Sequence, residues 1–157
     1  MARKRKTDQP KLADMEAMLR KLEAKTAHDV KERLGDQWRD NLFEILMTRL
    51  DLVSPDKKVY ASIPSALRKE PKEIPKFAKL FFKTMHNLLK LAKAPAQPHH
   101  TAAFSVLYAT VVDTFLKDDT RDHAKTMAAI DKRLGLFEQF VNCDPCKELK
   151  RQPDHHA

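Results

Sequence analysis

Glycine is nearly absent from this chain, which has only 2 glycines among 157 residues, and aromatic residues make up just 7%. Hairpin turns depend on glycine, and strands are enriched in aromatic and β-branched residues, so this composition argues against a β-sheet fold. The chain has 9 prolines and is 33% charged, as expected for polar-faced helices that end near prolines. We therefore expect an all-α fold, and the length suits one domain.

Cysteine is also scarce, because Cys143 and Cys146 are the only two in the chain. They lie too close together in the sequence for a disulfide between them to cross-link distant parts of the fold, so a disulfide framework is excluded. Their two-residue spacing also occurs in zinc knuckles and redox pairs, and His155 and His156 offer two more zinc ligands. No helix or strand context supports either site, so we expect free thiols and no bound metal.

Two further absences restrict the function. No apolar run approaches the ~20 residues that span a bilayer, and residues 1–10 lack the apolar stretch of a signal peptide. We therefore expect a cytoplasmic protein without a transmembrane segment. The sequence also has no GxSxG elbow, no glycine-rich phosphate loop and no HExxH motif, so we expect neither an enzyme nor a cofactor.

Acidic residues are in deficit, with 30 Lys and Arg against 22 Asp and Glu, and the net charge of +8 favours anionic partners. Most of the excess comes from residues 56–93, which hold ten Lys and Arg and three Asp and Glu. This lysine face either stays in solvent or docks on an anionic membrane or nucleic acid. A basic arm, which makes nonspecific phosphate contacts or is a solvated tail, contains Arg3, Lys4, Arg5 and Lys6.

Helical periodicity is what the sequence has in abundance. Apolar residues at steps of three and four predict about six helices, over residues 11–34, 36–53, 59–69, 74–93, 100–116 and 124–140. Thr120 or Asp122 is the expected cap of the last one. We expect a disordered basic arm over residues 1–10, a single helical domain over residues 11–141 and a flexible tail over residues 142–157.

The predicted helix over residues 100–116 is apolar on nearly every side. Such a helix must lie in the centre of a small domain, or a second subunit must cover its outer face. It should form a hairpin with the helix over residues 124–140.

Three segments are informative in their order and spacing: residues 39–51 (RDNLFEILMTRLD), 81–90 (FFKTMHNLLK) and 118–134 (DDTRDHAKTMAAIDKRL). Together they resemble the C-terminal half of bacterial TetR-family transcriptional regulators, over roughly residues 15–140. The likeness is greatest to the branch similar to coenzyme Q (ubiquinone) biosynthesis accessory proteins, which keep that fold and bind lipid. In the family, a helix-turn-helix domain of roughly 45 to 50 residues comes first. Only about ten residues precede the first helix here, too few for three helices. We therefore expect no DNA-binding domain and no sequence-specific DNA binding.

The resemblance also implies a ligand cavity and a dimer. The family's cavity lies among the middle helices, which here corresponds to Phe43, Met47, Phe77, Phe81, Met85 and Tyr108. The last two helices of the family pair with their copies in a second subunit as a four-helix bundle. The implied dimer interface consists of Phe104, Tyr108, Val111, Val112, Phe115, Met127, Ile130, Leu134 and Phe137.

Two functions follow from the resemblance. The first is a non-enzymatic TetR-like regulatory protein without its own DNA-binding domain. It acts by dimerising with itself or with a full-length TetR-like relative, and it binds a small apolar ligand. The alternative is a lipid-binding accessory protein of ubiquinone biosynthesis, which needs an apolar cavity and a surface for membrane contact.

Overall fold

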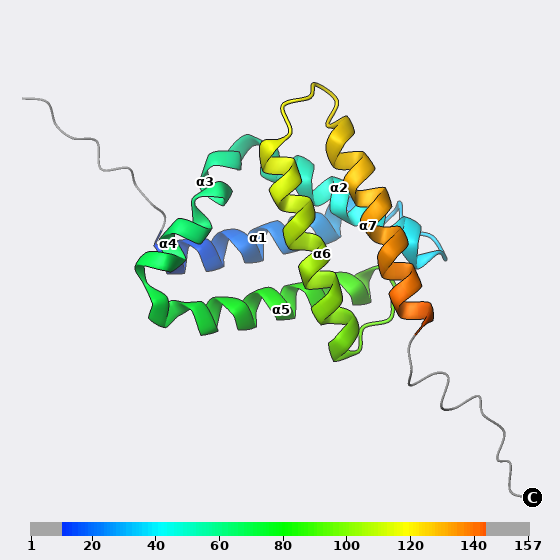
Figure 1. Cartoon of the computed structure of the whole chain (residues 1–157), viewed down its shortest axis with the longest axis horizontal. Helices are drawn as coiled ribbons and strands as arrows, with labels where there is room; N and C mark the ends of the chain where they lie inside the picture. Colours follow the sequence, from blue (N-terminus) through cyan, green and yellow to red (C-terminus); the bar gives the residue numbers. More distant parts are fainter. Residues whose placement is uncertain (1–10, 144–157) are drawn as a thin grey trace, which may run out of the picture.

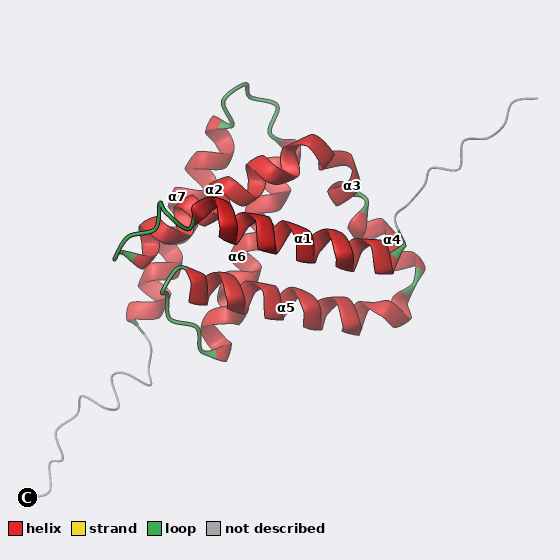
Figure 2. Cartoon of the chain, turned by 180° about the vertical axis from the view of Figure 1, so that it is seen from behind, coloured by secondary structure: helices red, strands yellow, loops and turns green. Residues whose placement is uncertain are grey.

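The computed structural model describes residues 11–143, and every regular element in that range is helical, which confirms the all-α prediction. Five long helices form most of the fold, while short helices connect the second long helix to the third (Figures 1 and 2). The α-helices are α1 (Leu12–Val30), α2 (Trp38–Val53), α3 (Lys57–Ala61), α4 (Ile63–Lys69), α5 (Ile74–Leu91), α6 (Pro98–Lys117) and α7 (Ala124–Asn142), with 3-10 turns η1 (Ser54–Asp56) and η2 (Pro71–Glu73).

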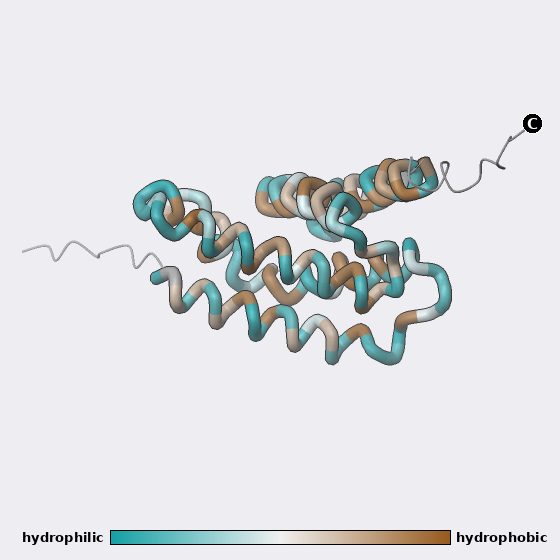
Figure 3. Tube along the Cα trace, turned by 90° about the horizontal axis from the view of Figure 1, so that it is seen from below, coloured by the Kyte–Doolittle hydropathy of each residue, from teal (hydrophilic) through white to brown (hydrophobic). Residues whose placement is uncertain are grey.

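The long helices are arranged in layers. Figure 3 shows the α6–α7 hairpin on one side of the molecule and α1 on the other. Between them, α2 packs on α1 and α7, and α5 packs on α1 and α6. The hairpin runs steeply across α1 and α5, and α3 and α4 close the end where α1 and α5 begin (Figure 1).

One buried side chain joins the two connections at the opposite end. Asn41 is 2% exposed, and its side-chain amide donates to the backbone oxygens of Gly35 (2.9 Å) and Ala92 (3.0 Å). Its Oδ1 accepts from the backbone N–H of Gly35 at 2.8 Å. The α1–α2 connection and the end of α5 are therefore fixed to the first turn of α2.

The predicted helix over residues 59–69 is in fact two helices, so seven α-helices occupy residues 11–143 where about six were expected. The backbone N–H of Ser62 bonds to Lys58 and Val59 oxygens, which ends α3, and Pro64 then occupies the first turn of α4. Proline has no N–H to continue the first helix, and it fits well at the start of the second.

The start of α7 is capped by a residue that the local sequence pattern does not indicate. Asp118 accepts hydrogen bonds from the backbone N–H groups of Thr120 and Thr126, both at 2.9 Å, and from both threonine hydroxyls. The expectation of a cap from Thr120 or Asp122 was wrong, because the first turn of α7 is capped from eight residues upstream. The Thr120 hydroxyl first, then that of Thr126, holds the pKa of Asp118 well below its usual range.

Helix α6 buries one broad side in the core, which accounts for many of its apolar residues, while Val106 on its outer side is 66% exposed. Phe104, Val111 and Phe115 on α6 are at most 1% exposed and pack in a core with Ile130 and other residues from α2, α5 and α7. Each such side chain contributes roughly 1.5–3 kcal/mol by leaving water.

This burial bears on the predicted dimer interface. Seven of its nine residues are at most 8% exposed inside one chain, so their side chains pack mainly within that chain and offer little surface to a second one. Val112 is partly buried, and only Met127, at 42%, is exposed. The seven are Phe104, Tyr108, Val111, Phe115, Ile130, Leu134 and Phe137.

The lysine face of α5 lies in solvent. Lys76, Lys79, Lys83 and Lys90 are all exposed, and Lys76 pairs with Glu16 of α1 at 3.3 Å. Along residues 11–143, no helix combines the length and apolar composition needed to cross a bilayer. Several predictions lie outside the described residues: the basic arm with Arg3, Lys4, Arg5 and Lys6, and Cys146, His155 and His156 in the tail.

Candidate functional site

A largely apolar cavity of ≈ 380 Å³ lies where α3 and α4 close the end of the helix layers. It is partly open to solvent, and its volume falls in the range of roughly 300–1,000 Å³ that is typical of small-molecule sites. Six helices contribute to its wall. The lining residues are Leu19 (α1), Arg49 (α2), Tyr60 (α3), Ile63 and Pro64 (α4), Phe77 and Phe81 (α5), and Tyr108, Ala109, Val112, Asp113 and Leu116 (α6).

Three aromatic rings form one wall of the cavity. Phe77 and Phe81, one turn apart on α5, are stacked with ring centroids 6.5 Å apart and planes at 11°. The ring of Phe81 lies 5.8 Å from that of Tyr108 on α6. Such a wall offers a large, rigid apolar surface at little conformational cost.

The polar feature of the cavity is the guanidinium of Arg49, a residue that is only 1% exposed. Its Nε donates to the Tyr108 hydroxyl at 2.7 Å, and its Cζ lies 5.4 Å from the centroid of the Tyr108 ring. Its Nη1 is buried and has no hydrogen-bond partner. Within residues 11–143, no carboxylate lies in salt-bridge range of this guanidinium.

Two other polar residues line the cavity. Burial raises the pKa of Tyr60 above its ordinary value, and the charge of Arg49 opposes that change. Tyr60 therefore keeps its proton at neutral pH, so its hydroxyl is a hydrogen-bond donor. Asp113, whose side chain is 65% exposed, accepts from Lys117 at 3.0 Å.

The structure brings together half of the predicted pocket residues. Phe77, Phe81 and Tyr108 line the same cavity. Met85 does not line it, because it is fully buried in the core one turn beyond Phe81, and Met47 packs against the core. Phe43 lines a different depression, on the outer side of α2.

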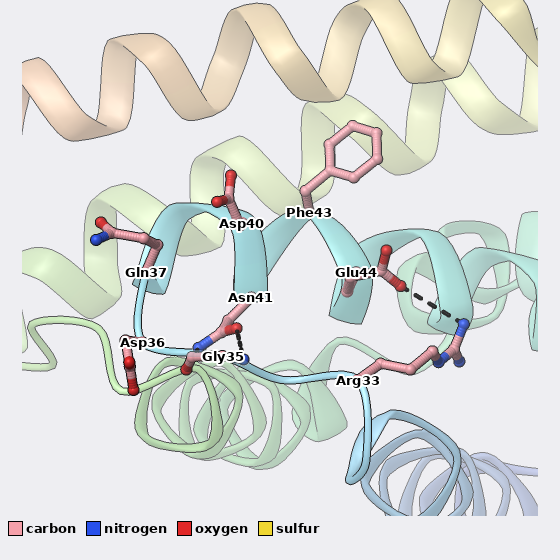
Figure 4. A pocket seen from close by; sticks show the side chains of 8 residues that line it. All are labelled: Arg33, Gly35, Asp36, Gln37, Asp40, Asn41, Phe43 and Glu44. Carbon is pink, nitrogen blue, oxygen red and sulfur yellow. Dashed lines mark hydrogen bonds and ion pairs between the residues drawn. The ribbon is translucent and has the colours of Figure 1, made fainter.

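That depression around the α1–α2 connection is polar, and the side chains of Arg33, Asn41 and Glu44 in it already bind other groups of the same chain. Figure 4 shows Arg33 and Glu44 pointing toward each other and Asn41 turned to Gly35. Nη1 of Arg33 lies 3.5 Å from the Glu44 carboxylate, and Nη2 donates to Thr48 at 3.1 Å. With these groups satisfied inside the chain, the depression has little to offer a ligand.

Sequence reasoning missed Arg49, although a signal for it was present. The buried stripe of α2 runs through Leu42, Ile45, Leu46 and Val53 at steps of three and four, and Arg49 occupies a position on the same stripe. Burying a cation on the apolar side of a helix costs free energy unless the charge has a specific partner. The stripe therefore indicates either a buried ion pair or a ligand contact.

Metal and catalytic sites were not expected, and the described part of the chain offers no group of three or more His, Cys, Asp or Glu side chains placed to hold a metal ion. Cys143 is exposed.

Comparisons of this chain with models of protein families, with curated protein sequences and with solved structures found no match.

Proposed function

We propose that this protein is a non-enzymatic binding protein that holds a small, largely apolar molecule in the Arg49 cavity, and that it corresponds to the ligand-binding and dimerisation half of a TetR-like regulator. The observation that carries the proposal is the cavity itself, with the Phe77, Phe81 and Tyr108 wall and an unpaired buried cation. Ligand sites are typically apolar clefts with few polar groups of this kind.

A cavity-filling substitution tests the binding site. Ala109 lies on α6, is exposed and lines the cavity, so Ala109→Trp should occupy the space without disturbing the core. Ala102, also exposed on α6 but outside the cavity lining, provides the matched control Ala102→Trp. The measurement is fluorescence of the neutral dye Nile red titrated with protein. We expect Ala109→Trp to abolish the fluorescence gain and Ala102→Trp to keep it. Equal binding by both variants would refute the site.

We also propose self-association, through a surface other than the one first predicted. Val106 on α6 and Leu136 and Phe140 on α7 are 66%, 50% and 46% exposed. They line a groove of ≈ 350 Å³ between the two helices, together with Ala103, Leu107, Thr110, Arg133 and Phe137. Large apolar residues gathered on one helix pair favour a partner of the same kind, as in helix bundles.

Native mass spectrometry tests self-association directly. Leu136→Glu should leave the fold intact and convert a dimer into a monomer, because the leucine is exposed in the single chain. Phe82→Glu on α5 is the control, since Phe82 is 40% exposed but lies away from the groove. A monomeric unmodified protein would overturn this part of the proposal.

The alternative, a lipid-binding accessory protein of ubiquinone biosynthesis, is favoured by one surface. Phe82 and Ile74 are exposed on α5 beside Lys76, Lys79 and Lys83. Exposed apolar residues next to lysines are typical of surfaces that dock on anionic membranes. Co-sedimentation with vesicles containing anionic lipid should then be weakened by Phe82→Ala and unaffected by Val106→Ala. Absence of binding to such vesicles would remove this alternative.

A further inference from the structure

We infer that the molecule bound in the cavity carries a single carboxylate at one end of an apolar body, and that Arg49 binds this carboxylate. The inference rests on the proposed function and assigns the chemical class of its ligand.

Arg49 places a buried positive charge in the cavity wall, because the residue is 1% exposed and its guanidinium is a cation. Its only hydrogen-bond partner within residues 11–143 is the neutral hydroxyl of Tyr108. Buried charges in proteins are normally paired, and a buried pair lacking one member is strongly unfavourable. An anionic ligand group supplies the missing member.

The charge of Arg49 matches a carboxylate better than a phosphate. One guanidinium balances one negative charge, as a carboxylate provides, whereas a phosphate monoester carries about −1.5 to −2 at neutral pH. The excess charge would lie in an apolar cavity that already borders the Asp113 carboxylate. Nη1 of Arg49 is buried and unpartnered, and a carboxylate oxygen accepts well from such a donor. The protonated hydroxyl of Tyr60 is a second donor on the same lining.

The remaining wall of the cavity suits an apolar ligand body. Beyond Arg49, the wall consists mainly of apolar side chains, among them Phe77, Phe81, Val112 and Leu116. A small hydrophilic acid such as acetate gains nothing from this wall. A medium-chain or aromatic acid buries its apolar body against the rings while its carboxylate reaches the guanidinium.

The test compares probes that share a tail and differ in the headgroup: decanoate, decan-1-ol, decyl phosphate and decyltrimethylammonium, each displacing Nile red from the full-length protein. We expect decanoate to bind more tightly than decanol by about tenfold to a hundredfold, the range that one charge-assisted hydrogen bond provides. Decyl phosphate should bind more weakly than decanoate, and the cationic probe should bind most weakly.

Substitutions then assign the effect to Arg49. Arg49→Met should remove the preference for decanoate over decanol. Arg121→Met, in the exposed connection between α6 and α7, removes the same charge away from the cavity and should leave the preference unchanged.

Each outcome is decisive. Equal binding of decanoate and decanol by the unmodified protein would overturn the carboxylate while the cavity proposal stands. No binding of Nile red or of any decyl probe would overturn the proposed function itself. Tighter binding of decyl phosphate would replace the carboxylate with a phosphate headgroup. If Arg49→Met fails to fold by circular dichroism, the probe series on the unmodified protein still decides the headgroup.

Discussion

The pairing of Arg49 with Tyr108 predicts a specific pattern of stabilities in the absence of ligand. Tyr108→Phe removes the acceptor of the Nε hydrogen bond and keeps the ring in place. Hydrogen bonds to charged groups contribute about 1.5–3 kcal/mol, so the free energy of unfolding should fall by about 2 kcal/mol. For a chain of this size that loss corresponds to a decrease of roughly 4–8 °C in the melting temperature.

Arg49→Met acts in two opposite ways. It removes a buried charge whose Nη1 is unpaired, which is favourable, but it leaves the hydroxyl of Tyr108 without its donor, at a cost of roughly 1–3 kcal/mol. We expect a net loss of about 1 kcal/mol, because replacing a buried charge by a side chain of similar volume is itself neutral to stabilising. The double variant has neither a buried charge nor an unsatisfied hydroxyl. Its stability should therefore lie within about 1 kcal/mol of the unmodified protein or above it.

The assay is urea unfolding followed by far-UV circular dichroism, with the four proteins analysed as a double-mutant cycle. The expected coupling between the two positions is about 2 kcal/mol, well above the few tenths found between independent sites. Additive effects of the two substitutions would refute the reasoning, because they would mean that the hydrogen bond between Nε and the tyrosine hydroxyl is not formed in solution.

Three further predictions concern the fold. Asp118→Asn should lower stability at neutral pH: the folded pKa lies below the unfolded value of about 3.9, so the ionised carboxylate stabilises the fold above that pH. The stabilisation is lost as the pH falls toward the folded pKa. The free energy of unfolding should therefore decrease less with falling pH in Asp118→Asn than in the unmodified protein. An equal decrease in both proteins would refute the cap. Leu134→Ala removes a core side chain that is 1% exposed and should cost about 2–5 kcal/mol in urea unfolding. Asn41→Ala leaves backbone groups of two connections unsatisfied and should cost about 1–3 kcal/mol, with faster amide exchange at Gly35.

The helices could be predicted from the sequence because burial of an apolar stripe is a local, periodic property. What the sequence did not reveal are contacts between distant residues. Asp118 caps α7 through Thr126, eight residues away, which no local cap pattern indicates. Ser62 ends α3 through ordinary backbone bonds just before Pro64, and a stripe of apolar residues continues across that break.

The cavity was only half predictable for a related reason. Phe77, Phe81 and Met85 form one stripe on α5, and their spacing in the sequence does not distinguish a cavity position from a core position. The stripe begins at the open end of the layers and runs into the core, so its first two members line the cavity and its third is fully buried. Depth along a helix depends on where other helices cross it, and that is set by tertiary packing. The predicted dimer interface includes seven core residues because a helix that is apolar on most sides does not reveal which of its sides packs within its own chain.

Helix α6 also places the two proposed surfaces next to each other. Ala109 and Asp113 line the Arg49 cavity on one side and a second depression with Val106, Thr110 and Arg133 on the other. A ligand held against Tyr108 and a partner seated on Val106 therefore contact opposite sides of the same two turns. If occupancy of the cavity changes the dimer dissociation constant by some factor, dimerisation must change ligand affinity by that same factor, since binding free energies are reciprocal. Decanoate titrations at protein concentrations below and above the dimer dissociation constant measure one factor, and the dimer constant with and without saturating decanoate measures the other. If neither the ligand affinity nor the dimer dissociation constant changes, the two sites are independent and α6 separates them. If both change by the same factor, α6 couples the two sites.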